Sequence, residues 1–131
     1  MAAAESYPDD LKYHEEHDWA RVEGEEAVLG ITWFAADALG ELVHFEPPGA
    51  GSNVTKGQSY GEVESVKAVS DVIAPLSGEV LEVNQQVVDA PETVNEDPYG
   101  NGWLIRIRVS DAGEVDALLD AGAYKQVLAD Q

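Results

Sequence analysis

The amino-acid sequence predicts a mainly β fold of two small sheets in two related halves, with a short internal helix and C-terminal helices. Short runs that alternate between apolar and polar residues, separated by turns rich in Gly and Pro, are typical of half-buried strands. A Gly-Glu-apolar opening occurs at Gly40 and again at Gly78, 38 residues later, and a strand-like run follows each. This repeat predicts that the two halves resemble each other.

The composition indicates one globular domain. With 131 residues and 44% apolar residues spread evenly, the chain can build its own core. We therefore expect a single domain over residues 1–131, with a loose N-terminus over about 1–10. The sequence has no run of roughly eighteen apolar residues, so no membrane span is predicted. The absence of cysteine and of a signal-peptide or transit-peptide pattern at the N-terminus predicts a cytoplasmic protein without disulfides.

The formal net charge of −19 is the strongest compositional feature. It argues against binding to nucleic acids and against attraction to anionic membranes, because both repel an acidic surface. It favours encounters with basic patches on partner proteins, which salt would weaken. A solvated surface adapted to a salty interior is the alternative, and the two can hold together.

Before residue 60 the pattern predicts four strands and one helix. Thr32 suits a helix N-cap and Gly40 suits the position after the last turn, so a short helix is expected between them. Trp33 and Phe34 in this helix are expected in the core. The strands are expected at 11–13, 20–23, 27–31 and 41–45, with a turn at Gly24-Glu25 and a loop over 47–52.

After residue 60 further strands and two helices are expected. A helix is predicted over 111–120, because Glu114 follows the candidate cap Asp111 by three residues. A break at Gly122 then precedes a second short helix over 124–129, so that helices occupy about 111–130. The apolar stripe of the first helix is Val115, Leu118 and Leu119, the strands include 72–74, 78–83 and 104–109, and a dense turn segment covers 95–103.

The stretch from Gly61 to Val72 predicts a hairpin. Val63 and Val69 share one parity of the alternation, whereas Val66 and Val72 have the other, as expected when a tight turn lies between two strands. The corners of this turn are Ser65 to Ala68. Because no Gly or Asn occurs there, a turn that needs positive φ is disfavoured and a type I geometry is expected.

Lys67 is placed at the tip of this hairpin. The chain has only seven Lys and Arg residues, and the next basic residue after Lys67 is Arg106. An isolated amine between small residues, with Glu62, Glu64 and Asp71 nearby, is accessible to an enzyme that acylates it. A rigid tip also suits a swinging prosthetic arm. The simpler interpretation is an exposed turn lysine.

The segment Glu64-Ser65-Val66-Lys67-Ala68 resembles the lipoylation site of glycine cleavage system H proteins. The resemblance extends from about Leu11 to about Tyr124. It implies a barrel-sandwich hybrid fold of the biotinyl/lipoyl-carrier kind, with two small sheets and quasi-two-fold symmetry. It also implies that lipoic acid is joined to Lys67 through an amide and that Glu64, Ser65, Val66 and Ala68 flank the attachment site.

The resemblance implies a carrier and not an enzyme. The lipoyl arm would receive the aminomethyl group of glycine at the pyridoxal-phosphate glycine decarboxylase (P protein) and deliver it to the tetrahydrofolate-dependent aminomethyltransferase (T protein). Dihydrolipoamide dehydrogenase (L protein) would reoxidise the arm, and a lipoate ligase or lipoyltransferase would attach it. The sequence contains no phosphate-binding loop and no recognisable pairing of a nucleophile with a base, which agrees with a carrier.

In the family, the segment that matches His17-Asp18-Trp19 lies beside the pocket for the loaded arm. The resemblance therefore suggests Asp18 and Asp71, with Glu16 and His17, as residues of an arm or cargo cleft. Asp18 stands where the family often has Glu, and Glu16 where a small polar residue is common. Surface acids unrelated to cargo are the alternative. His14 and His17 have no supporting cluster, so no metal site is predicted.

Other carriers have a similar hairpin. Biotinyl domains usually have Met on both sides of the lysine, whereas Val66 and Ala68 occupy those positions here. Lipoyl domains of 2-oxoacid dehydrogenase complexes are commonly shorter and followed by linkers, and no Pro/Ala-rich linker is visible. An H-like protein that relays lipoate to other carriers stays an open alternative.

Overall fold

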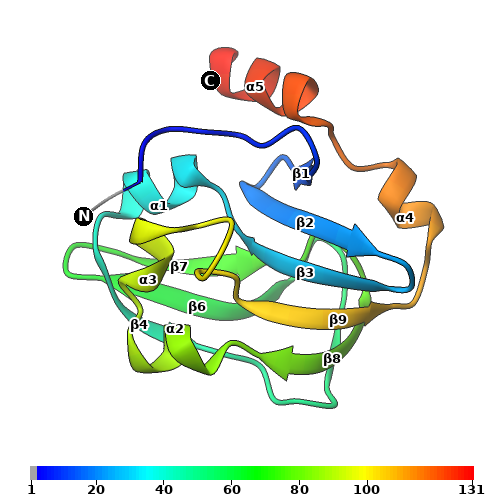
Figure 1. The fold of residues 1–131 in the computed structure, drawn as a ribbon, viewed down its shortest axis with the longest axis horizontal. Helices are drawn as coiled ribbons and strands as arrows, with labels where there is room; N and C mark the ends of the chain where they lie inside the picture. The colour runs from blue at the N-terminus through cyan, green and yellow to red at the C-terminus, as the bar shows by residue number, and fades with distance from the viewer. Residues whose placement is uncertain (1–2) are drawn as a thin grey trace.

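The computed structural model describes residues 3–131, which form two antiparallel sheets and five short helices (Figure 1). The larger sheet has the order β1 (Lys12–His14), β2 (Asp18–Glu23), β3 (Glu26–Ile31), β9 (Ile105–Val109), β8 (Gly78–Val83), β5 (Asn53–Val54). The smaller sheet has the order β4 (Leu42–Glu46), β6 (Ser59–Ser65), β7 (Val69–Ile73). The predicted mainly β fold with two sheets is confirmed.

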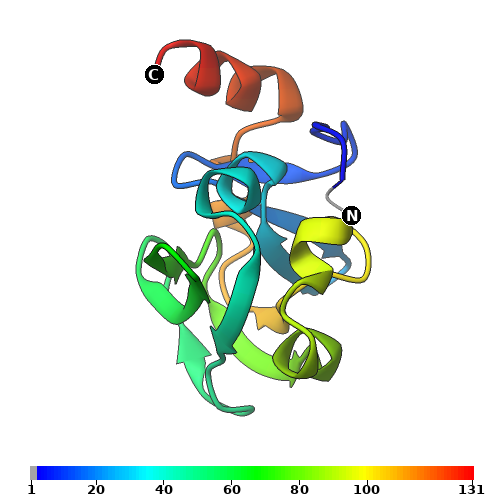
Figure 2. The ribbon, with the colours of Figure 1, turned by 90° about the vertical axis from the view of Figure 1, so that its left-hand side faces the viewer.

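The helices lie at the ends and edges of the sheets. They are α1 (Trp33–Leu39), α2 (Gln85–Asp89), α3 (Thr93–Glu96), α4 (Gly113–Asp116) and α5 (Ala121–Ala129). In Figure 2, α1 lies between α5 and the β6–β7 hairpin. No helix within residues 3–131 has the length and apolar character needed to span a bilayer.

The main core lies between the two sheets. Leu29 and Ile107 of the larger sheet and Phe45 and Val63 of the smaller sheet are almost completely buried and belong to one apolar cluster. A second cluster beneath α5 is rich in aromatic residues and includes Tyr13, Trp19 and Tyr124. Burial of alternate residues on both sheets explains the period-two patterns in the sequence.

The repeat in the sequence corresponds to a repeat in the structure. The β4–β6 pairing shifts register between Leu42 and His44, and the β8–β9 pairing shifts between Val80 and Glu82. The two irregularities are thus 38 residues apart, the same spacing as the two Gly-Glu openings. Equivalent bulges in the two halves agree with the predicted quasi-two-fold relation.

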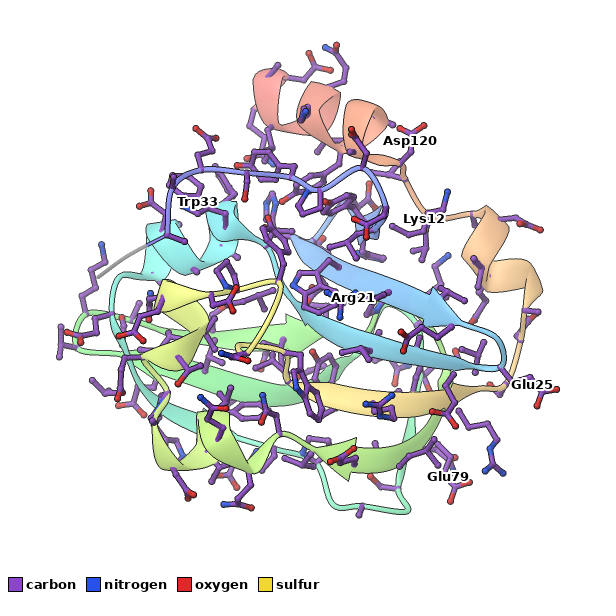
Figure 3. All side chains as sticks on the ribbon, viewed as in Figure 1. Lys12, Arg21, Glu25, Trp33, Glu79 and Asp120 are labelled. Atoms are coloured by element: carbon purple, nitrogen blue, oxygen red, sulfur yellow. The ribbon has the colours of Figure 1, made fainter. Side chains whose placement is uncertain are left out.

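The ends of α1 are as predicted, but its aromatic residues are only partly buried, and Trp33 packs at the edge of the second apolar cluster. The Thr32 hydroxyl accepts from the Ala35 N–H at 3.3 Å, and Gly40 has φ 85°. Ala36 is the buried residue of this helix, and Trp33 and Phe34 are only half-buried. The Trp33 indole lies toward the N-terminal segment (Figure 3), where it donates to the Ala3 carbonyl at 2.8 Å. The reason is that α1 turns Ala35, Ala36 and Leu39 toward the main core, which leaves Trp33 and Phe34 at its margin.

The predicted helix over 111–120 is wrong in extent, because α4 has only four residues. The Glu114 carboxylate does not turn back to Asp111; it accepts from the N–H and hydroxyl of Ser77 at 2.8 and 2.9 Å. Leu119 then forms a β-bridge with Tyr13, with two backbone hydrogen bonds of 2.8 Å. Pairing with β1 therefore replaces the last turns of the expected helix.

The last helix starts earlier than predicted. Asp120 caps α5 by accepting from the Ala123 N–H at 2.8 Å, so Gly122 lies within the first turn and is not a break. The helices α2 and α3 were not predicted. Both are single turns, and the first depends on an Asn84 cap in a segment without helical periodicity.

Residues 3–10, predicted to be loose, contact the rest of the chain. The Ala3 N–H donates to the Asn95 carbonyl at 2.9 Å, and the Tyr99 hydroxyl donates to the Ser6 carbonyl at 2.7 Å. The first two residues of the predicted loose terminus lie outside the described residues. The N-terminal segment therefore lies against α1 and α3.

Candidate functional site

The β6–β7 hairpin holds Lys67 at its turn. The strands pair in register from Glu62 opposite Asp71 to Glu64 opposite Val69, and the turn projects at the left of Figure 1. Lys67 is exposed, and among residues 3–131 no carboxylate forms an ion pair with it. The structure thus presents a free ammonium group on a β-hairpin, as the sequence predicts.

The Ser65 side chain closes this turn. Ser65 is 4% exposed, and its hydroxyl oxygen accepts from the N–H groups of Lys67 at 3.3 Å and Ala68 at 3.1 Å. The Ser65 N–H in turn donates to the Ala68 carbonyl at 2.8 Å. No residue of the turn has positive φ, as predicted. A side-chain hydroxyl, and not a glycine, therefore makes the tight turn possible.

The surroundings of Lys67 are apolar at the tip and acidic behind it. Val66 and Val69 are 87% and 60% exposed, which is unusual for valine. Behind them the exposed row Glu46, Glu62 and Asp71 crosses the three strands in register. The tip therefore offers an apolar contact surface next to a band of negative charge.

A cleft of about 170 Å³ lies beside the hairpin. The β1–β2 turn and the start of β2 form one wall, α1 forms the second, and β6 and β7 form the third. All four cleft residues expected from the sequence line it: Glu16, His17, Asp18 and Asp71. Its apolar lining includes Ile31, Phe34, Leu39, Val63 and Val72. The lining of the cleft thus combines three carboxylic side chains with an apolar surface.

Asp18 is the most unusual residue of the cleft. It is 2% exposed, and its Oδ1 has no hydrogen-bond partner. Burial raises the pKa of its carboxyl well above the ordinary value, while a hydrogen bond from the Ile73 backbone acts in the opposite direction. A buried carboxyl without a counter-ion is costly and is expected to favour a cationic group that enters the cleft.

Tyr60 also has a buried polar atom without a hydrogen-bond partner, and it was not singled out from the sequence. Its hydroxyl is buried without a partner, and its pKa is raised by burial and by the charge of Asp18. Phe34, expected in the core, is instead a wall of the cleft. Tyr60 occupies an inward-facing position of β6. Because a buried tyrosine hydroxyl usually has a polar partner, such a position could have indicated a polar neighbour in the fold.

His17 is a further polar residue of the cleft. Its Nδ1 lies 2.8 Å from the Tyr124 hydroxyl, and its ring lies 4.7 Å from that of Phe34. Burial lowers the pKa of the imidazole, which favours the uncharged form. His14 has a different role, since its Nδ1 accepts from the Glu16 N–H at 3.1 Å. No three His, Cys, Asp or Glu side chains in the described part of the chain are grouped to hold a metal ion.

Comparison with known proteins identifies the family. A sequence model of the glycine cleavage H-protein family matches residues 11–131. The chain belongs to this family. The matched region contains the hairpin, the cleft and α5, so the H-protein resemblance noted from the sequence is confirmed over nearly the whole chain.

Individual H proteins agree with this assignment. The glycine cleavage system H protein of Anaeromyxobacter sp. (strain K) is 53% identical over 124 residues, covering 95% of this chain and 97% of that protein. The probable H protein of Haloarcula marismortui is 52% identical over 118 residues, covering 90% and 93%. The crystal structure of the H protein from Mycobacterium marinum is 41% identical, with a TM-score of 0.86, and covers 93% of this chain and 98% of that one. The barrel-sandwich fold expected from the family is therefore confirmed.

Proposed function

We propose that this chain is the lipoylated carrier of a glycine cleavage system, with lipoic acid joined through an amide to the Lys67 side chain. One observation carries the proposal: an exposed ammonium on a hairpin tip lies beside a cleft whose lining contains a buried carboxyl without a counter-ion. Membership of the H-protein family supports it. Lipoate supplies a disulfide whose reduced sulfurs can carry the aminomethyl group of glycine.

The residues of the cleft fit such an arm. The apolar lining of Phe34, Leu39 and Val63 suits a hydrocarbon chain, and the carboxyl groups of the lining suit the ammonium of an aminomethyl group. Asp18 and Asp71 would balance that charge, with Glu16 at the exposed rim and His17 beside them. Because Asp18 is buried, the cleft would also exclude water and slow hydrolysis of the cargo.

The protein itself would act as a carrier and not as a catalyst. Its partners would be the P, T and L proteins of the system and the lipoate ligase or lipoyltransferase that acylates Lys67. The exposed valines at the tip and the acidic row behind them support contact with partner surfaces that are apolar at the centre and basic at the rim. The cytoplasmic location stays a prediction from the sequence.

The decisive experiment is an intact-mass spectrum after incubation with a lipoate ligase, lipoate and ATP, followed by peptide mapping. We expect a gain of one lipoyl group on the peptide that contains Lys67. The Lys67→Arg variant should gain none, and Lys56→Arg, which changes a lysine on another turn, should behave as the wild type. No gain, or a gain at another lysine, would overturn the attachment site.

A second assay separates glycine cleavage from lipoate relay. Lipoylated protein is mixed with P protein, glycine and labelled bicarbonate, and exchange of label into glycine is measured. Exchange that requires Lys67 would support the glycine cleavage role. Lipoylation without exchange would favour a protein that relays lipoate to other carriers.

A further inference from the structure

The backbone at His17 has an uncommon conformation. Within residues 3–131, His17 is the one residue other than glycine with positive φ, at 75°. Such conformations persist where surrounding contacts fix them, and they are frequent at functional sites. On the backbone, the His17 N–H donates to the His14 carbonyl at 2.9 Å, and the His17 carbonyl accepts from the Thr32 N–H at 3.0 Å. These bonds hold the residue between the two walls of the cleft.

The C-terminal segment contacts both ring nitrogens of His17, one through α5 and the other through Gln131, which follows this helix. The Tyr124 hydroxyl lies 2.8 Å from Nδ1, and the side-chain amide of Gln131 lies 3.3 Å from Nε2. Tyr124 is completely buried and stacks on Tyr13, with ring centroids 4.8 Å apart and planes 8° from parallel. A rigid aromatic pair beneath α5 thus fixes the position of the hydroxyl that meets His17.

The same hydroxyl contacts the other wall of the cleft. Tyr124 Oη lies 2.9 Å from Thr32 Oγ1, and Thr32 is the N-cap of α1. Since α1 contributes Phe34 and Leu39 to the cleft, one tyrosine links α5 to two cleft walls. Among the described residues, no other side chain is hydrogen-bonded to both His17 and the cap of α1.

The hydrogen-bond chain selects one tautomer of His17. Burial raises the pKa of Tyr124 to about 12, so its hydroxyl is neutral and has one proton to donate. Thr32 Oγ1 already accepts from the Ala35 N–H, and Tyr124 Oη is the acceptor within reach of its proton. The Tyr124 proton is then donated to His17 Nδ1, which leaves the ring proton on Nε2. The Gln131 amide nitrogen lies 3.3 Å from Nε2, and a 180° turn of this exposed amide places its oxygen there as the acceptor of the ring proton. If His17 Nδ1 donated to Tyr124 instead, Tyr124 would donate to Thr32 Oγ1, and the Thr32 proton would lose its acceptor.

We propose that Tyr124 is a positioning residue of the cleft, which holds His17 as the uncharged Nε2–H tautomer beside the cationic end of the loaded arm. This inference rests on the lipoyl-carrier function proposed above. An imidazolium at this place would repel an ammonium, whereas a neutral ring leaves the carboxyls free to attract it. The charged and titratable groups around His17 are Glu16 and Asp18 on its own segment, Asp71 from β7 and Tyr124 from α5.

The test compares two buried tyrosines. Tyr124→Phe removes the hydroxyl that meets His17, while Tyr13→Phe removes one that donates to the Pro8 carbonyl at 2.7 Å. The first readout is the ¹⁵N spectrum of the His17 ring as a function of pH, which needs no lipoate. The second is the lifetime of the aminomethyl-loaded arm in lipoylated protein.

We expect the wild type and Tyr13→Phe to show a protonated Nε2 and an unprotonated Nδ1. Tyr124→Phe should mix the tautomers, raise the pKa of His17 and shorten the lifetime of the loaded arm several-fold, most strongly at acidic pH. An unchanged tautomer, or a lifetime no shorter than in Tyr13→Phe, would overturn the proposal.

If Tyr124→Phe does not fold, Gln131→Ala at the exposed C-terminus replaces it. That variant should retain the Nε2–H tautomer, because Tyr124 selects it, and a changed tautomer would contradict the proposal. A protein that takes up no lipoate would overturn the carrier function, while the ¹⁵N spectrum would still decide whether Tyr124 positions His17.

Discussion

The end of the Lys67 side chain lies next to Gly40, the residue that ends α1. A Cβ atom built on Gly40 would stand 3.4 Å from Cε of Lys67 and 3.9 Å from its Nζ. The amine at the hairpin tip is therefore supported by an element outside the hairpin. Since the carbonyl end of α1 carries partial negative charge, the ammonium is also in favourable electrostatic surroundings there.

Gly40→Ala should affect both folding and acylation. Gly40 has φ 85° and ψ −168°, a region that is almost exclusive to glycine. We expect a loss of about 1–3 kcal/mol in the free energy of unfolding. The added methyl group would also contact the Lys67 side chain, so the initial rate of lipoylation should fall. Urea unfolding and timed mass spectra measure the two effects.

Gly49→Ala is the matched control for this prediction. A Cβ at Gly49 meets no atom within 4 Å, and its φ is outside the positive range. We expect stability within about 0.5 kcal/mol of the wild type, as for most surface substitutions. Equal losses in the two variants would refute the special role of Gly40.

Ser65→Ala should loosen the turn that presents Lys67. The substitution removes the acceptor for the N–H groups of Lys67 and Ala68. Loss of a comparable side-chain cap costs about 1 kcal/mol. Amide hydrogen exchange at residues 67 and 68 should accelerate, and lipoylation should slow. Ser59→Ala, at an exposed position of the same strand, should change neither rate; protection retained at both amides in Ser65→Ala would contradict the prediction.

The hairpin was predictable because its determinants are local. The phase break between Val63 and Val69 follows from the period of a strand, and Lys67 is isolated in the sequence itself. The part played by Ser65 as a turn acceptor could not be read from this pattern, since it depends on the burial of one hydroxyl. Local chemistry thus predicted the position of the turn but not the group that closes it.

The cleft was predictable only through family resemblance. Residues 16–18 and Asp71 are far apart in sequence and belong to different sheets, so the packing of the two sheets, and not a local pattern, brings them together. No local signal places Tyr124 against His17, which is 107 residues away. The extent of the C-terminal helices was predicted wrongly because it also depends on a distant contact: Leu119 forms a backbone bridge with Tyr13, and this bridge replaces continuation of the helix.

Asp18→Asn should change the pH dependence of stability. The pKa of Asp18 is raised by burial, so the folded state retains this proton at pH values where the unfolded state, near 3.8, has lost it. The wild type should therefore lose stability as pH rises from about 4 toward the folded pKa, and Asn at this position removes that loss. The stability of Asp18→Asn relative to the wild type should increase with pH in this window. Urea unfolding at several pH values measures the difference, and a difference independent of pH would contradict the burial of an uncompensated carboxyl.

The Asn95 side chain joins the end of α1 to the start of β4. The sequence predicted only that this residue lies in a turn segment. Its Oδ1 accepts from the Leu42 N–H at 2.9 Å, and its Nδ2 donates to the Gly40 carbonyl at 2.9 Å. Asn95→Ala would leave both backbone groups without partners, which should cost about 1–3 kcal/mol. Because Gly40 supports Lys67, lipoylation should slow in parallel. Asn101→Ala, at an exposed turn position, is the control; an equal loss of stability there would show that Asn95 has no special role at this junction.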